Sequence, residues 1–178
     1  GPRANGGRRY WPKQMWERAC PAKRRASGAR SRRRRCAELN YRWIAEHFTI
    51  EPHDREILDD PKAQVIDTGG EVFFAIVADT VAGTVAMVRA DPTLFELTKM
   101  AVAPEFQGRG IANLLMKACI DYARENGGDT IFLETNSKLP AAIALYTKFG
   151  FLHTPLDPNS QYSRANVRME LALNPANQ

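Results

Sequence analysis

The chain has 178 residues, of which 25 are Lys or Arg and 20 are Asp or Glu, for a formal net charge of +5. It contains no apolar run near the roughly 18 to 20 residues of a membrane helix, and its first residues lack the apolar segment of a secretory signal. Its three cysteines, Cys20, Cys36 and Cys119, have no metal-binding or disulfide-framework spacing, so we expect a cytoplasmic protein without structural disulfides or metal.

The positive charge lies at one end of the chain. Residues 1–36 hold 13 Lys and Arg and one acid, for a net charge of +12, whereas residues 37–178 hold 12 basic and 19 acidic residues, for a net charge of −7. The first segment has too few bulky apolar side chains to form a core. We expect residues 1–36 to be a disordered basic extension, or foreign to the native protein, and residues 37–178 to be one domain. An arm that binds nucleic acid through arginines is the alternative.

Apolar spacing predicts two helices after this segment. In the first helix, the apolar residues recur at helical intervals: Leu39, Trp43, Ile44 and Phe48. We expect that helix over residues 31–48 and a second over residues 52–58, with Pro52 in its first turn and Pro61 behind its end.

Strands follow a turn at residues 69–70. Three strand-like runs, residues 72–78, 81–90 and 94–102, are separated by short polar turns. This pattern is typical of an antiparallel meander.

Helix and strand then alternate to the end of the chain. The predicted elements are a helix from residue 111 that closes at residues 127–128, a strand over 130–135, a helix over 141–149, and strands over 151–153 and 167–173. The alternation resembles a βαβ unit, and the whole pattern predicts a mixed α/β fold without internal repeats.

The sharpest local motif lies where the third strand ends and the next helix begins. The stretch reads Gln107-Gly108-Arg109-Gly110-Ile111-Ala112. Free backbone N–H groups at a helix N-terminus attract anions, and glycines let a pyrophosphate approach the backbone closely. Neither the Walker pattern nor the three-glycine dinucleotide pattern is present, so the common ATP and NAD sites lose their main support.

This motif resembles the acetyl-CoA loop of the GNAT superfamily of N-acetyltransferases, Gln/Arg-x-x-Gly-x-Gly/Ala, with Gln107, Gly110 and Ala112 at the matching positions. Residues 142–151 resemble the family's A-x-x-L-Y-x-x-x-G-F segment and follow one helix and one strand later, as in the family. The resemblance covers residues 37–173.

The resemblance implies a splayed, mostly antiparallel sheet flanked by helices, in which the strands near 94–102 and 130–135 part around the pantetheine arm. The family's N-terminal edge strand has no counterpart in residues 19–36, so we expect it to be missing or replaced by a poor substitute within residues 10–16. An unpaired edge would lower stability or favour a homodimer.

The family resemblance also implies a reaction, direct transfer of an acetyl group from acetyl-CoA to an amine of a small molecule, peptide or protein, without a metal. It assigns Tyr146 as the general acid, and a phenol with a reference pKa near 10 keeps its proton at neutral pH. Backbone N–H groups near the strand end can meet the oxyanion. The residues expected to bind acetyl-CoA are Met100, Ala101, Val102, Gln107, Gly108, Arg109, Gly110, Ile111, Ala112, Asn136 and Tyr146.

Two carboxylates are candidates for the general base. Glu96 lies six residues before Val102, as in the histone-acetyltransferase branch, and strand alternation places it on the face of Thr98 and Met100. Glu134 lies twelve residues before Tyr146, as in the ribosomal-protein acetyltransferase branch. A water chain, or no dedicated base, is the third interpretation.

Two other functions stay open at this point. The chain could be a CoA-binding regulatory module without catalysis, or a nucleic-acid-associated protein led by its arginine-rich segment. The acceptor is not identified by the sequence, but the two N-terminal helices and residues 154–166, including Tyr162, should shape its site. The three histidines, His47, His53 and His153, have no ligand spacing.

Overall fold

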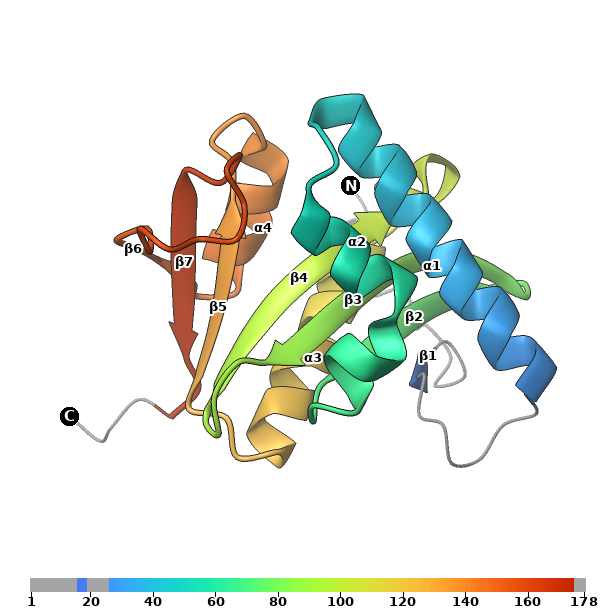
Figure 1. Cartoon of the computed structure of the whole chain (residues 1–178), viewed down its shortest axis with the longest axis horizontal. Helices are drawn as coiled ribbons and strands as arrows, with labels where there is room; N and C mark the ends of the chain where they lie inside the picture. Colours follow the sequence, from blue (N-terminus) through green and yellow to red (C-terminus); the bar gives the residue numbers. More distant parts are fainter. Residues whose placement is uncertain (1–15, 19–25, 175–178) are drawn as a thin grey trace, which may run out of the picture.

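The computed structural model describes residues 16–18 and 26–174, which form one sheet with helices on both faces (Figure 1). The strands are β1 (Trp16–Arg18), β2 (Glu71–Val77), β3 (Thr80–Arg89), β4 (Leu94–Val102), β5 (Thr130–Thr135), β6 (Leu152–Thr154) and β7 (Val167–Ala172). The helices are α1 (Ala26–His47), α2 (Pro52–Asp59), α3 (Ile111–Glu125) and α4 (Pro140–Lys148), with a π-helix, η2 (Lys62–Ile66), and a 3-10 turn, η3 (Pro104–Phe106). None of the helices in these ranges is long and apolar enough to cross a bilayer.

The sheet has seven strands in the order β1-β2-β3-β4-β5-β7-β6. All neighbours are antiparallel except β4 and β5, which are parallel and therefore need a crossover, which α3 supplies. The mixed, mostly antiparallel α/β fold predicted from the sequence is confirmed. Between residues 50 and 173 the predicted elements lie within two residues of their predicted bounds, and η2 is an additional element.

The N-terminal edge of the sheet is replaced rather than missing. The three residues of β1 pair with residues 73–75 of β2, so a short strand protects part of that edge. The helix α1 begins at Ala26, five residues before its predicted start, so the boundary predicted at residue 36 lies within it. Cys36 is buried, with its Sγ 3.1 Å from Thr84 Oγ1. Residues 1–15 and 19–25 of the predicted basic extension lie outside the described residues.

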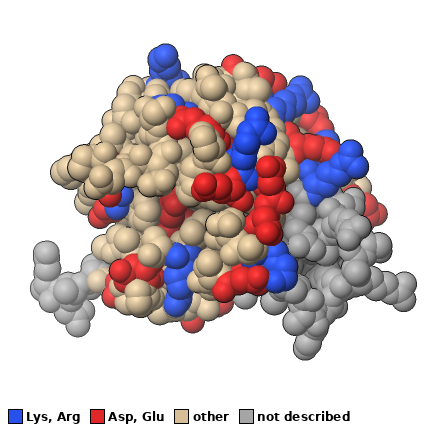
Figure 2. All heavy atoms as spheres, viewed as in Figure 1, with Lys and Arg blue, Asp and Glu red and all other residues tan. Residues whose placement is uncertain are grey.

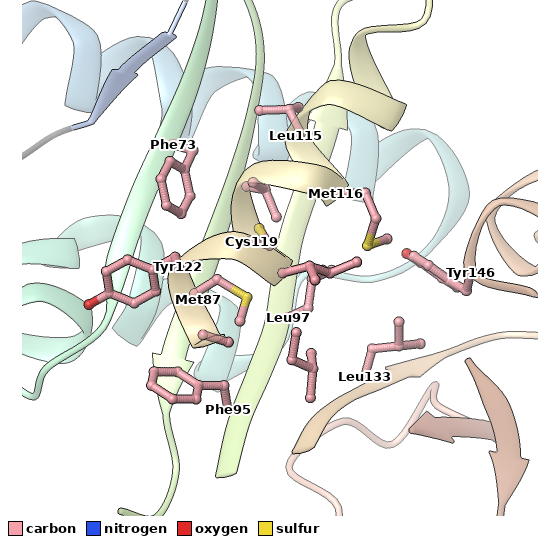
Figure 3. Packing of buried hydrophobic residues seen from close by; sticks show 14 of the residues in the cluster. Phe73, Met87, Phe95, Leu97, Leu115, Met116, Cys119, Tyr122, Leu133 and Tyr146 are labelled. Carbon is pink, nitrogen blue, oxygen red and sulfur yellow. The ribbon is translucent and has the colours of Figure 1, made fainter. Parts of the chain in front are cut away.

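The sheet is buried on both faces. Under α3 lies the larger core, which includes Phe73, Met87, Phe95, Leu97, Leu115, Met116 and Cys119 (Figure 3). On the opposite face, α1, α2 and η2 cover a second core that includes Leu39, Ile57, Val65, Val72 and Phe74. Two packed faces hold the central strands in place.

A bulge interrupts the pairing of β4 with β3. Thr84 lies opposite Ala101 but Ala86 lies opposite Thr98, so β4 contains one extra residue, and Lys99 has a φ of +54°. The bulge overturns the simple alternation expected for this strand, because Met100 packs against the α3 core instead of sharing a face with Glu96.

Candidate active site

A cleft opens where β4 and β5 separate. The two strands pair only through residues 94–96 and 130–132, and beyond these pairs they diverge (Figure 1). The cleft has a volume of about 1040 Å³. Of the predicted site residues, it is lined by Met100, Ala101, Val102, Gln107, Gly108, Gly110, Ile111, Ala112, Glu134, Asn136 and Tyr146. Arg109 and Glu96 are not among its lining residues.

One end of the cleft is formed by the loop before α3. Gly108 and Gly110 have φ values of +71° and +81°, which side-chain-bearing residues rarely adopt, and a Cβ at either position would meet no atom within 4 Å. No side chain caps the N-terminus of α3. Gln107 Nε2 donates to the Val102 carbonyl at 3.2 Å, which ties the loop to the end of β4. Exposed amides, an open approach and the helix dipole can bind a pyrophosphate there.

Arg109 lies outside this end of the cleft. Its guanidinium is stacked over the Phe106 ring, 5.3 Å from the ring centroid. The side chain is exposed, so it can add positive charge near the loop without lining the cavity.

The backbone of β4 forms one wall. Ala101 and Val102 pair with Thr84 and Gly83 of β3, while β5 has already turned away from their other side. The segment 97–102 therefore borders the gap on its β5 side, where an amide can meet a developing oxyanion.

Tyr146 stands in the opposite wall, on α4. Its ring packs 6.0 Å from that of Phe151, and its hydroxyl points toward Met116 on α3 (Figure 3). Burial, with a smaller contribution from Cys119, raises the pKa of Tyr146 to about 12. The phenol therefore keeps its proton at neutral pH, as a general acid requires.

The two candidate carboxylates have different surroundings. Glu134 lines the cleft and already has partners, because it accepts a short hydrogen bond from Ser160 Oγ and lies 3.7 Å from Arg168 Nη1. Glu96 lies outside the gap, at the end of β4 that still pairs with β5. It has no hydrogen-bond or ion-pair partner within residues 34–174. Burial raises the pKa of Glu96, although Lys99, His53 and Arg168 oppose the rise.

Asn136 lines the cleft but uses its amide within the protein. Its Nδ2 donates to the Arg164 carbonyl at 2.6 Å, and its Oδ1 accepts from the Lys138 amide at 2.9 Å. The side chain thus links β5 to the loop before β7.

A buried group of charged side chains on the α2 side of β4 was not predicted from the sequence. Asp54, which is fully buried, contacts Lys99 and Arg164, and Lys99 also contacts Tyr162. Asp54 and Lys99 are 45 residues apart and Asp54 and Arg164 110 residues apart. Their only signal in the sequence is a lysine inside an apolar strand, which does not identify its partner. Tyr162 was expected near the acceptor, and it does line the cleft.

No cluster of three His, Cys, Asp or Glu side chains in the described ranges could hold a metal ion. His53 lies beside Glu56 and its ring is 5.1 Å from that of Tyr162, and His47 stacks on Trp43. That the protein needs no metal stays a prediction.

Comparison with known proteins gives one consistent family. The model of the acetyltransferase (GNAT) family matches residues 37–151. The uncharacterized N-acetyltransferase YvbK of Bacillus subtilis is 28% identical over 117 residues, which make up 64% of this chain and 76% of that protein. Three further curated relatives match over only 42 to 47% of their own length.

Solved structures agree with this family in their fold. An acetyltransferase of the GNAT family from Staphylococcus aureus Mu50 has a TM-score of 0.74 at 22% identity, over 82% of this chain and 95% of that chain. A Bacillus subtilis acetyltransferase in complex with CoA has a TM-score of 0.62 at 20% identity, over 89% of this chain and 97% of that one.

Proposed function

Because the chain belongs to the acetyltransferase (GNAT) family of acyltransferases, we propose that it transfers the acetyl group of acetyl-CoA directly to a primary amine. The observation that carries this proposal is the arrangement along one cleft. A glycine loop with free amides lies at one end, Tyr146 stands in the wall, and carboxylates lie on the two strands that border the gap. A CoA-bound structure of the same fold supports acetyl-CoA as the cosubstrate.

In the proposed mechanism, the backbone of residues 108–113 binds the pyrophosphate and β4 contributes an amide for the oxyanion. Tyr146 donates its proton to the departing thiolate. A lysine-like amine, with a pKa near 10.4, is neutral in only about one molecule in a thousand at pH 7, so a base must take its proton.

We assign the base to Glu96. Its carboxylate has no partner in the described part of the chain, and its raised pKa makes it a better proton acceptor than an ordinary carboxylate. Because Glu96 lies outside the cavity lining, a water molecule has to relay the proton past Thr98. Glu134 is the less suitable base, because Ser160 and Arg168 already contact its two oxygens.

Charge on the described surface does not favour nucleic acid as a partner. On the face seen in Figure 2, Lys and Arg side chains alternate with Asp and Glu over the region that α1 and α2 cover. Recognition of a phosphate backbone needs a continuous basic stripe, and the described side chains on this face do not form one. A cationic amine is the better fit to a domain whose residues 37–178 carry a net charge of −7.

The proposal is tested by release of free thiol from acetyl-CoA in the presence of an amine panel. The panel holds small primary amines, polyamines, lysine peptides and peptides with free N-termini. We expect thiol release that depends on one of these classes, with the acetylated amine identified by mass spectrometry. Tight binding of CoA without amine-dependent release would instead identify a regulatory module.

A further inference from the structure

Three segments of the chain meet at one buried carboxylate beside the cleft. Asp54 of α2 accepts from Lys99 Nζ at 2.7 Å, and Arg164 of the β6–β7 loop donates to both its oxygens at 2.7 Å. Burial alone would raise the pKa of Asp54, but the hydrogen bonds from Arg164 and Lys99 outweigh it and hold this pKa well below its usual range. Asp54 is therefore a charged anchor for two cations from distant parts of the chain.

The loop is attached at a second point. Glu51, directly before α2, accepts from the backbone amides of Ser163 and Arg164 at 2.8 and 3.2 Å. It also accepts from Arg164 Nη1 at 3.2 Å. Ser163 and Arg164 are thus fixed to the start of α2 by main-chain and side-chain bonds together.

Lys99 connects this anchor to the cleft. The bulge in β4 gives Lys99 its left-handed backbone and sends its side chain toward α2. Its ammonium donates to Tyr162 Oη at 2.8 Å and lies 4.5 Å from the centroid of the same ring. Tyr162 lines the cleft, and its Oη is 3.5 Å from Thr98 Oγ1. A strained backbone whose side chain is held by two buried partners, Asp54 and Tyr162, is typical of a functional site.

Glu96, the carboxylate that we assign as the base, lies three residues before Lys99 on the same strand. Glu96 and Thr98 share one face of β4, and Thr98 contacts the tyrosine that Lys99 holds. The charged groups that act on Glu96 come from four elements: Lys99 on β4, His53 on α2, Glu134 on β5 and Arg168 on β7. Of these, Lys99 opposes the burial of Glu96 most strongly.

We propose that Lys99 is a positioning residue of the acceptor side of the cleft, whose ammonium, held by Asp54, fixes Tyr162 in the wall and places a positive charge on the strand that carries Glu96. This inference rests on the proposed function. It adds a residue that does not touch the reacting atoms but acts on two that border them. The role proposed for Lys99 depends on its charge as well as on its contacts, so a variant that changes only the charge distinguishes it from a packing role.

The test compares the pH dependence of kcat/KM for the best amine in the wild type, Lys99→Met, Lys99→Arg and Asp54→Asn. Without the ammonium the pKa of Glu96 rises, so the acidic limb of the Lys99→Met profile should move up by about one pH unit. Lys99→Arg keeps the charge, and its limb should stay near that of the wild type. Asp54→Asn removes the carboxylate that holds both Lys99 and Arg164, so KM for the amine should rise as Tyr162 loses its fixed place in the wall.

Three results would overturn the inference. The first is a Lys99→Met profile with an unmoved limb and an unchanged KM for the amine. The second is an Asp54→Asn variant with an unchanged KM for the amine. The third is a Lys99→Arg limb that moves as far as that of Lys99→Met.

Folding is checked by the affinity for CoA, which should stay within about twofold because the glycine loop takes no part in the bonds that Asp54 and Lys99 make. If Lys99→Met does not fold, Lys99→Gln replaces it, because its amide has no charge but can still donate a hydrogen bond to a neighbouring oxygen, and the same shift is expected. Failure of the proposed function is distinct, because the wild type would then release no thiol with any amine.

Discussion

At the scale of single residues, Tyr146 combines a buried ring with a hydroxyl group that keeps its proton at neutral pH. A local motif identifies it, and the fold buries its ring in the cleft wall with its hydroxyl toward α3. Because burial raises its pKa to about 12, the proton stays on the phenol across the range in which the enzyme is assayed.

Replacing Tyr146 by Phe removes the proton donor and keeps the packing of the ring. We expect kcat to fall about 100-fold, at the lower end of the range for general acid catalysis, with KM for acetyl-CoA within about twofold. Steady-state kinetics at pH 7 to 9 measure both. An unchanged kcat would remove Tyr146 from the acid role.

A pair of matched variants, Glu96→Gln and Glu134→Gln, separates the candidate bases. Loss of an unpartnered base should lower kcat/KM for the amine at least about tenfold in Glu96→Gln and abolish the acidic limb of the profile. Glu134→Gln should keep that limb and instead lower the melting temperature, because Ser160 and Arg168 lose a charged partner. The reverse pattern would transfer the base to Glu134.

At the scale of elements, the sequence predicted strands and helices because each carries its own apolar period and turn residues. The hairpin of β2 and β3 turns through Ala78 and Asp79, both with positive φ, close to its predicted place. The bulge at Lys99 was not predicted, because a lysine that follows Thr98 out of phase with the alternation does not by itself show where an extra residue lies. The contacts of Asp54 were not predicted either, because only the folded sheet brings α2 to the loop before β7.

The loop before α3 allows a controlled test with two glycines. Gly110 and Gly127 have similar φ values, +81° and +78°, and a Cβ at either would meet no protein atom within 4 Å. Replacement of either by Ala should therefore lower the free energy of unfolding by about 1 kcal/mol through the backbone alone.

Only Gly110→Ala should also raise KM for acetyl-CoA severalfold, because its methyl group enters the space next to the free amides. Gly127, at the other end of α3, is the control. Denaturant unfolding and KM measurements test both variants, and an equal KM in the two would argue against a phosphate site at this loop.

At the scale of the whole molecule, the net charge of +5 combines a basic N-terminal segment with an acidic domain. Part of that segment belongs to the folded domain: β1 forms an edge of the sheet, and α1 begins at Ala26. The function proposed for the cleft does not need β1, since β2 and β3 separate β1 from β4, the strand that borders the cleft.

Deletion of residues 1–25 should therefore lower the melting temperature by a few degrees and leave amine-dependent thiol release largely intact. Removal of β1 exposes the donors and acceptors of β2, so association that increases with protein concentration is also expected. Size-exclusion chromatography and thermal unfolding compare the two forms. A shortened chain that is monomeric and equally stable would contradict this view of the edge.

The parting of β4 and β5 has a mechanical consequence. With only three residue pairs between them, the sheet is two half-sheets joined at one end, and Gly127-Gly128 is the covalent link that precedes the second half. Both halves contribute to the core under α3, with Leu97 and Leu115 on one side and Leu133 and Met169 on the other. A chain cut at this link would give two complementary fragments. A molecule bound along the cleft would contact both fragments and so stabilise their complex.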